Sequence, residues 1–243
     1  MFKKFALPLV VLAALTAAQL SNVAQAQTAV LAPIAKDTAS YLIVTQVDMR
    51  KCASPMCGGY YVKSVNQALT RCADGVFRKE CHAFTLNTDA LGWTDDQKAT
   101  FDEQFASGHA IVKGKLASAA VIGTTKGDVL TISEAWQGAA LSQPKGTFYS
   151  VKFTGIVCIT APCPSIGATA LNVPMAKTTN PDVDLASSGA DEAAQLAGSE
   201  AIFKGGILAA GNIVSTRTTN AATGKVIKGS KLVTSEFYLP AKP

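Results

Sequence analysis

The sequence predicts an α+β fold built from two tandem β-β-α-β-β repeats with antiparallel sheets, braced by disulfide bonds. Three features predict this fold class: short runs of β-branched and aromatic residues, a helix pattern in each half, and an internal similarity between the halves. The expected units are residues 40–140 and 146–240, with an N-terminal extension over residues 27–39. Whether the two units pack about a pseudo-twofold axis or share one sheet stays open.

The internal similarity consists of three blocks that occur in the same order in both halves. The matched segments are 52–57 with 158–163, 110–114 with 201–205, and 127–136 with 229–238. Asn66 falls on Asn172 when the first block is extended without a gap. Similar blocks in one order predict tandem copies of a unit of about 100 residues.

Strand patterns open and close each unit. Residues 41–47 and 148–153 are rich in β-branched and aromatic side chains, and residues 59–65 predict a strand that returns from the first turn. The closing strands are expected at 110–116, 129–136, 202–209 and 231–239. Each unit therefore contains two pairs of neighbouring strands.

A helix is expected between the two strand pairs of the first unit. Thr94 is a suitable N-cap, and Gln97 three residues later completes a capping box. Phe101 and Phe105 lie four residues apart and form an apolar face, and Gly108 ends the helix.

The second unit repeats this helix less clearly. Ser188 is the expected N-cap, and Asp191 adds a negative charge to the first turn. Leu196 contributes to a weak apolar face, and Gly198 is the expected end of the helix.

Residues 1–26 predict a cleavable signal peptide. Lys3 and Lys4 precede an apolar run over residues 5–18, and Ala24-Gln25-Ala26 forms a small-x-small cleavage site. The apolar run is shorter than the roughly 20 residues that a membrane-spanning helix needs. We therefore expect a periplasmic or extracellular protein without membrane insertion after cleavage.

The six cysteines predict disulfide bonds, because an even number in an exported chain is typical of oxidised pairs. Short spacings and enclosed turn residues favour three local bonds: Cys52–Cys57, Cys72–Cys81 and Cys158–Cys163. A bond between the two copies, from Cys52 or Cys57 to Cys158 or Cys163, stays open as an alternative.

A metal-handling protein is an alternative interpretation of the same cysteines. The Cys-x4-Cys pairs, with Met56 nearby and His82 beside Cys81, could form a copper ligand set. The Cys-x2-Cys pairs typical of zinc ribbons and of thiol redox motifs are absent from the sequence. We expect no metal site and no cofactor.

Few residues suggest catalysis, and the catalytic residues stay unknown. The chain has two histidines, His82 and His109, and neither lies in a triad or metal motif. The paired carboxylates at 95–96, 102–103 and 191–192 fit solvated helix faces. A secreted hydrolase of extracellular or cell-wall polymers is a second alternative, and Glu134, His82 and His109 are its candidate residues.

Four residues are candidates for binding. Tyr60 and Tyr61 are neighbours in a predicted strand, so one is expected in the core and the other toward solvent, where it could anchor a partner. Glu134 and Glu236 follow a serine in the third matched block. Each is expected to accept backbone N–H bonds at a strand end or to repeat a binding position.

The net charge argues against nucleic acid as a partner. It is +5 for the whole chain and falls by two when Lys3 and Lys4 are removed with the signal peptide. The basic residues are scattered, whereas nucleic-acid-binding proteins concentrate them on one patch.

The motifs at residues 57–66 (CGGYYVKSVN) and 158–165 (CITAPCPS) resemble a family of exported bacterial proteins known as a domain of unknown function. The similarity extends to Glu134-Ala-Trp136 and to Gly146-Thr-Phe-Tyr149, so it covers nearly all of the chain after residue 26. The resemblance implies export, bacterial origin and disulfide bonds. It implies no activity, substrate or catalytic residue.

We therefore expect an exported, non-enzymatic binding or interaction module with an unknown protein or polymer partner. The rigid disulfide turns, the two copies and the missing catalytic motifs favour this class over the hydrolase and the metal-handling protein. One form of it is a protease inhibitor that presents residues 160–164 as its bait loop.

Overall fold

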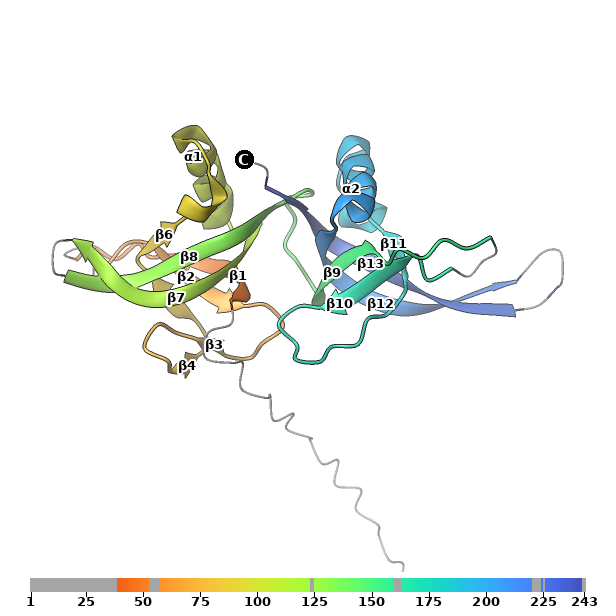
Figure 1. Cartoon of the computed structure of the whole chain (residues 1–243), viewed down its shortest axis with the longest axis horizontal. Coiled ribbons are helices and arrows are strands. Elements are labelled where there is room, and N and C mark those ends of the chain that lie inside the picture. The colour runs from red at the N-terminus through yellow and green to blue at the C-terminus, as the bar shows by residue number, and fades with distance from the viewer. Residues whose placement is uncertain are drawn as a thin grey trace, which may run out of the picture. The chain divides into compact units, whose positions relative to one another are not determined.

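The first half of the chain folds into a sheet that one helix covers. The computed structural model describes residues 39–52, 57–122, 125–159, 163–219, 224 and 226–241. The strands of this half are β1 (Ser40–Val47), β2 (Tyr60–Ser64), β3 (Thr70–Arg71), β4 (Phe77–Arg78), β5 (Cys81–Ala83), β6 (Thr85–Asn87), β7 (Ala110–Ile122) and β8 (Thr125–Gly138). A 3-10 turn, η1 (Asp89–Leu91), precedes helix α1 (Asp95–Ala106) (Figure 1). The predicted signal peptide lies outside the described residues.

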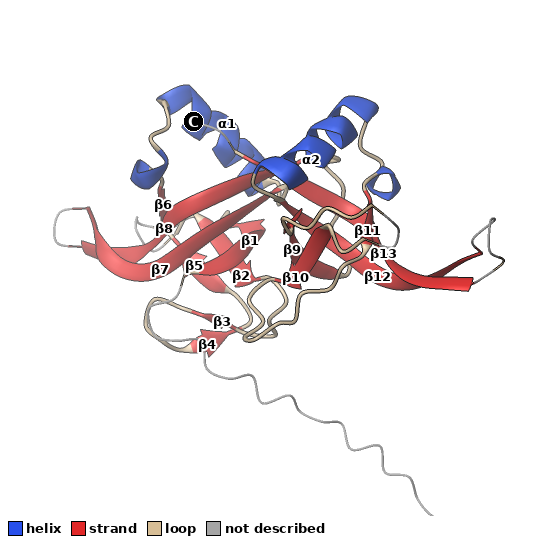
Figure 2. Cartoon of the chain, turned by 45° about the vertical axis from the view of Figure 1, so that its right-hand side comes forward, coloured by secondary structure: helices blue, strands red, loops and turns tan. Residues whose placement is uncertain are grey.

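The second half repeats much of this succession. Its elements are β9 (Thr147–Phe153), β10 (Ile166–Ala170), β11 (Asp182–Asp184), η2 (Ala186–Ser188), α2 (Glu192–Lys204), β12 (Ile207–Thr219) and β13 (Val226–Pro240). Figure 2 shows both helices on the same side of the strands. The long hairpins β7–β8 and β12–β13 extend in opposite directions (Figure 1).

One sheet of 11 strands joins the two halves. Its main path is β10-β9-β12-β13-β8-β7-β1-β2-β5, and all pairs along this path are antiparallel. Two short strands pair in parallel outside this path, β6 with β8 and β11 with β13. The predicted α+β composition with mostly antiparallel pairing is confirmed, but the predicted order lacked these two strands.

Helix α1 begins as its sequence predicts. The Thr94 hydroxyl accepts a bond from the Gln97 backbone N–H, and the Gln97 side chain accepts one from the Thr94 N–H. This capping box satisfies backbone donors that the first helical turn leaves open. Phe101 and Phe105 are buried, and Gly108 follows the helix with a positive φ of 78°.

The prediction for the second helix was wrong at both ends. Asp191, not Ser188, is the N-cap, and its carboxylate accepts a bond from the Ala194 N–H at 2.7 Å. The helix does not end at Gly198, which lies in its middle. A Cβ atom there would come within 2.7 Å of the Phe237 ring, so the glycine permits close packing of the helix on the sheet.

The second matched block of the internal similarity was misaligned. Residues 201–204 are helical, and β12 begins only at Ile207, so they do not correspond to the strand at 110–114. Gly211, not Gly205, occupies the position that Gly114 has in the first half. The pairing register shifts at each of these two glycines, as in a β-bulge, and a side chain at either would collide with the neighbouring strand's backbone.

Three apolar clusters form the core. One lies under α1 and another under α2. The third contains residues from both halves: Ile43, Val65, Ile111 and Trp136 with Leu171, Leu208 and Tyr238. This third cluster buries the face of each half that its own helix does not cover.

Two asparagines bind the halves together by reciprocal hydrogen bonds. The Asn66 amide donates to the carbonyls of Phe148 and Leu171 at 2.7 and 3.0 Å, and its oxygen accepts from the Phe148 N–H at 2.9 Å. Asn172 makes the mirrored set, with Tyr41 O, Val65 O and Tyr41 N at 2.7, 3.0 and 2.9 Å. Both asparagines have a positive φ, 59° and 54°, a conformation that asparagine tolerates better than most residues.

Candidate functional site

The neighbouring tyrosines of β2 point to opposite faces of the sheet, as their alternation predicts. Tyr60 packs beside Phe105 under α1, with 5.3 Å between the ring centroids. Tyr61 lies against His82 of the adjacent edge strand β5, also at 5.3 Å. Both side chains are partly buried, and of the two only Tyr60 packs against the apolar cluster under α1.

Tyr61 belongs to a charged cluster at this edge of the sheet. We call Asp48, Arg50, Tyr61 and His82 the edge cluster. Nε and Nη2 of Arg50 donate to the two carboxylate oxygens of Asp48 at 2.9 and 2.8 Å, and the Arg50 carbon Cζ lies 6.0 Å from the Tyr61 ring centroid. These contacts fix the guanidinium beside the aromatic ring, a geometry typical of cation–π pairs.

The buried carboxylate of Asp48 holds the other charged side chains of the edge cluster in place. Its side chain is 1% exposed, and the hydrogen bonds from the Arg50 guanidinium keep the pKa of its carboxyl well below the ordinary value. Nε2 of His82 lies 3.2 Å from Oδ2 of Asp48 and 2.7 Å from the Gly58 carbonyl. Both neighbours are acceptors, so this ring nitrogen carries the hydrogen.

Disulfide bonds flank the edge cluster on two sides. The structure pairs Cys52 with Cys57 in the β1–β2 connection, Cys72 with Cys81 at the start of β5, and Cys158 with Cys163 in the second half. The predicted local pairing is confirmed, and the bond between the copies is excluded. All six cysteines are oxidised, so none supplies the thiolate that the copper hypothesis requires.

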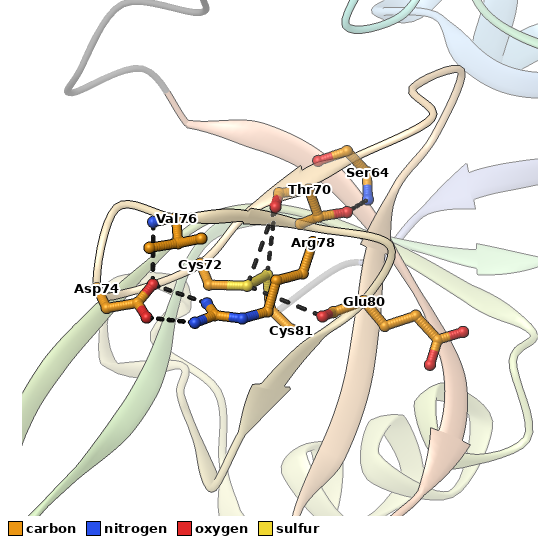
Figure 3. The surroundings of a disulfide bond; sticks show 8 residues. All are labelled: Ser64, Thr70, Cys72, Asp74, Val76, Arg78, Glu80 and Cys81. Atoms are coloured by element: carbon orange, nitrogen blue, oxygen red, sulfur yellow. Dashed lines mark hydrogen bonds and ion pairs between the residues drawn. A yellow bond between two sulfur atoms is a disulfide. The ribbon is translucent and has the colours of Figure 1, made fainter.

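Ion pairing supports the Cys72–Cys81 turn (Figure 3). Asp74 accepts two bonds from the Arg78 guanidinium, at 2.9 and 2.7 Å, and one from the Val76 N–H at 3.0 Å. The two cysteines are 7% and 2% exposed and form part of the core under α1. The turn therefore positions His82, the residue after Cys81, on a rigid base.

Glu236 is a structural residue in this fold. It is fully buried, and its carboxylate accepts bonds from the backbone N–H groups of Ala140, Ser142 and Phe237 at 2.9, 2.7 and 2.9 Å. These bonds hold the segment between β8 and β9 against β13. The expected role as an acceptor of backbone N–H bonds describes Glu236 well.

Glu134 has a different environment from Glu236. Its side chain is 47% exposed, and it forms an ion pair with Lys113 at 2.7 Å across the β7–β8 hairpin. Lys113 also lies 5.7 Å from the ring centroid of Tyr41. Among the described contacts Glu134 accepts from Lys113 and not from a backbone N–H, so the backbone-acceptor role describes Glu236 and not Glu134.

The candidate catalytic residues have unrelated partners. His82 contacts Asp48 and Gly58, Glu134 contacts Lys113, and Nδ1 of His109 is buried without a hydrogen-bond partner among the described residues. Within those ranges, no three His, Cys, Asp or Glu side chains gather closely enough to hold a metal ion. None of the helices described here is long and apolar enough to cross a membrane.

Two features of this region were not predicted. The Asp48–Arg50–His82 contacts join the segment directly after β1 to strand β5, although an acidic and a basic residue directly after a strand were a local signal. Asp102 was expected on a solvated helix face, but it lies partly buried near Tyr60, and burial raises the pKa of its carboxyl. Helical spacing alone does not reveal what packs beside a helix.

Comparison with known proteins places this chain in a family. Residues 41–243 match DUF6748, a domain of unknown function, and the chain belongs to this family. Searches of curated proteins and of solved structures each found no match. The family assignment agrees with the expected resemblance to a domain of unknown function and assigns no activity.

Proposed function

We propose that the protein is an exported, non-enzymatic binding module whose recognition surface is the edge cluster. The observation that carries this proposal is the arrangement of Tyr61 beside Arg50 and His82, fixed by the buried Asp48 carboxylate. Tyrosine and arginine are enriched among the residues that dominate binding interfaces. A surface that is rigid before binding loses less conformational entropy when the partner arrives.

The disulfide bonds support export to the periplasm or the cell exterior. Such bonds form and persist in oxidising compartments and are rare in the cytosol. Two of the three bonds lie in the same half as the edge cluster, where they brace the β1–β2 connection and the turn before β5. The partner on this proposal is a protein or a polymer outside the cytoplasm, not nucleic acid.

We also propose that the chain arose as a tandem repeat. Similar successions of elements, the two bulge glycines and the reciprocal asparagine contacts support this view. The unit includes one short parallel strand before each helix, β6 or β11, in addition to the predicted elements.

A capture experiment with matched variants tests the binding proposal. Oxidised wild-type protein, Tyr61→Ala and Phe203→Ala are immobilised and exposed to periplasmic and extracellular fractions. Phe203 is an exposed aromatic residue of α2, in the other half, and serves as the control. We expect a partner retained by the wild type and the control and lost with Tyr61→Ala, because that change removes the central ring.

The same set of retained molecules for all three proteins would refute the edge cluster as the recognition surface. Circular dichroism and thermal melting of each variant show whether a loss of capture comes from unfolding. Tyr61 lies on the outer face and belongs to none of the three apolar clusters, so Tyr61→Ala is expected to fold.

A further inference from the structure

A pocket lies on the other face of β2 from the edge cluster, between the sheet and α1. Its volume is about 310 Å³, within the range of small-molecule sites. Four parts of the chain meet there: the end of β1, the start of β2, the β5–β6 segment and one face of α1. The lining residues that matter below are Val47, Tyr60, Phe84, Leu86, Lys98 and Asp102.

Asp102 gives the pocket an unsatisfied carboxylate. It is partly buried, and it forms no hydrogen bond or ion pair with any residue in the described ranges. Burial alone raises the pKa of this carboxyl. A carboxylate that has lost part of its contact with water and gained no protein partner favours a cationic ligand group, because such a group would replace the lost interactions.

Tyr60 adds a second polar group beside Asp102. Burial raises the pKa of its hydroxyl, and the nearby Asp102 charge raises it further. The hydroxyl has no hydrogen-bond partner within the part of the chain that the structure describes. It can therefore donate to a ligand while its ring stays packed on Phe105.

Lys98 supplies the opposite charge one helical turn away. Residues four apart on a helix lie about 5–6 Å from each other at Cβ, and both Lys98 and Asp102 line the pocket. The Lys98 ammonium instead lies 3.5 Å from Asp95, whose side chain is fully exposed. Exposed ion pairs of this kind contribute little, so Lys98 can turn to a ligand at small cost.

We propose that this pocket binds an α-amino acid with an apolar side chain in its zwitterionic form. The ligand's ammonium contacts the Asp102 carboxylate and its carboxylate contacts the Lys98 ammonium. The side chain of the ligand lies against Val47, Phe84 and Leu86. A simple amine would face repulsion from Lys98, and a simple acid would face repulsion from Asp102, so the charge pair selects a ligand with both charges.

Calorimetric titration of the oxidised wild-type protein with L-leucine tests this proposal. Two analogues lack one charge each: 3-methylbutylamine has no carboxylate and 4-methylpentanoate has no ammonium. We expect L-leucine to bind at least about tenfold more tightly than either analogue, the equivalent of one charge-assisted hydrogen bond. Absence of L-leucine binding at millimolar concentration, or equal binding of either analogue, would overturn the proposal.

Substitutions on α1 locate the binding. Asp102→Asn and Lys98→Gln are each expected to weaken L-leucine binding about tenfold or more, because each removes one charged partner. Glu103→Gln is the matched control, since Glu103 is exposed and neighbours Asp102 on the same helix. Binding of L-leucine that survives both pocket substitutions unchanged would overturn the assignment.

Methyl NMR spectra give a second readout that does not depend on affinity. L-leucine is expected to shift the methyl signals of Val47 and Leu86 in the wild type, and those of the distant Val233 and Leu239 much less. Equal shifts throughout the protein, or none at Val47 and Leu86, would contradict binding in this pocket. The same spectra confirm that each variant keeps the native fold.

Discussion

The outer edges of the two halves differ although their first two strands are alike. In the first half, β2 carries Tyr61 and pairs with β5, which presents His82. In the second half, the equivalent strand β10 carries Gly167, and a Cβ there would come within 2.8 Å of Thr178. A bare glycine packed against threonine offers no anchor for a partner. On the binding proposal, the recognition surface therefore lies in the first half, and the matching strand of the second half lacks its aromatic side chain.

Disulfide removal should show the largest difference between the halves. Cys72→Ala/Cys81→Ala is expected to cost about 3–4 kcal/mol, because it frees a turn and removes buried sulfur atoms from the core. The Cys158–Cys163 bond closes a shorter loop and Cys158 is exposed, so Cys158→Ala/Cys163→Ala is expected to cost about 2 kcal/mol. Urea unfolding of both double variants measures the two free energies. Equal losses would mean that the core packing of Cys72 and Cys81 adds nothing.

The glutamate pair provides the next comparison. Glu236→Gln is expected to reduce the free energy of unfolding by about 3 kcal/mol, because three buried N–H groups lose their charged acceptor. Glu134→Gln breaks only an exposed ion pair with Lys113, for which about 0.5 kcal/mol is expected. Urea unfolding measures both values on the same protein background.

The ratio of the two losses in the free energy of unfolding tests whether Glu236 and Glu134 have separate roles. Losses of similar size would contradict the assignment of separate roles. A loss of partner capture in Glu134→Gln without a loss of stability would instead support a binding role for this position.

The asparagine contacts between the halves should respond symmetrically. Asn66→Gly and Asn172→Gly each remove three hydrogen bonds across the junction, while glycine adopts the positive φ without strain. We expect each to cost about 2 kcal/mol, with the two values close to each other. Thermal and urea unfolding measure both losses. A much smaller loss in one variant would show that the two matching sets of hydrogen bonds contribute unequally to the free energy of unfolding.

Acidification of the edge cluster is the comparison with the smallest expected effect. The quantity compared is the slope of the free energy of unfolding against pH in the wild type and in Asp48→Asn. The pKa of Asp48 is lowered in the folded protein from its ordinary 3.8, so its pairing stabilises the fold above that pH. This contribution is lost as pH falls toward the lowered value, while Arg50 stays charged. Asp48→Asn should therefore remove part of the acid sensitivity between about pH 4 and pH 2. Parallel curves for wild type and variant would contradict the assignment.

Local signals in the sequence predicted most of the first helix and all disulfide pairs. The capping box of Thr94 and Gln97 involves residues three apart, and each cysteine pair encloses one short turn. Such features depend little on what packs against them. That Tyr60 and Tyr61 point to opposite faces was also predictable, because strand alternation is local.

Contacts between distant segments account for the errors. The sequence predicts a helix end at Gly198, but this glycine packs against Phe237, which is far away in the sequence. The strands β6 and β11 have three residues each, too few to show an alternating pattern. The burial of Asp102 depends on the β5–β6 segment crossing beside α1, and no spacing within α1 reports it.

The third apolar cluster has a consequence for the order in which the chain acquires its structure during synthesis. Ile43, Val65, Ile111 and Trp136 are made first, and their covering residues Leu208 and Tyr238 follow only near the far end of the chain. A ribosome-bound chain that ends before β12 therefore exposes the apolar side chains of this cluster to solvent. We expect such intermediates to be readily cut by protease and to bind holdase chaperones.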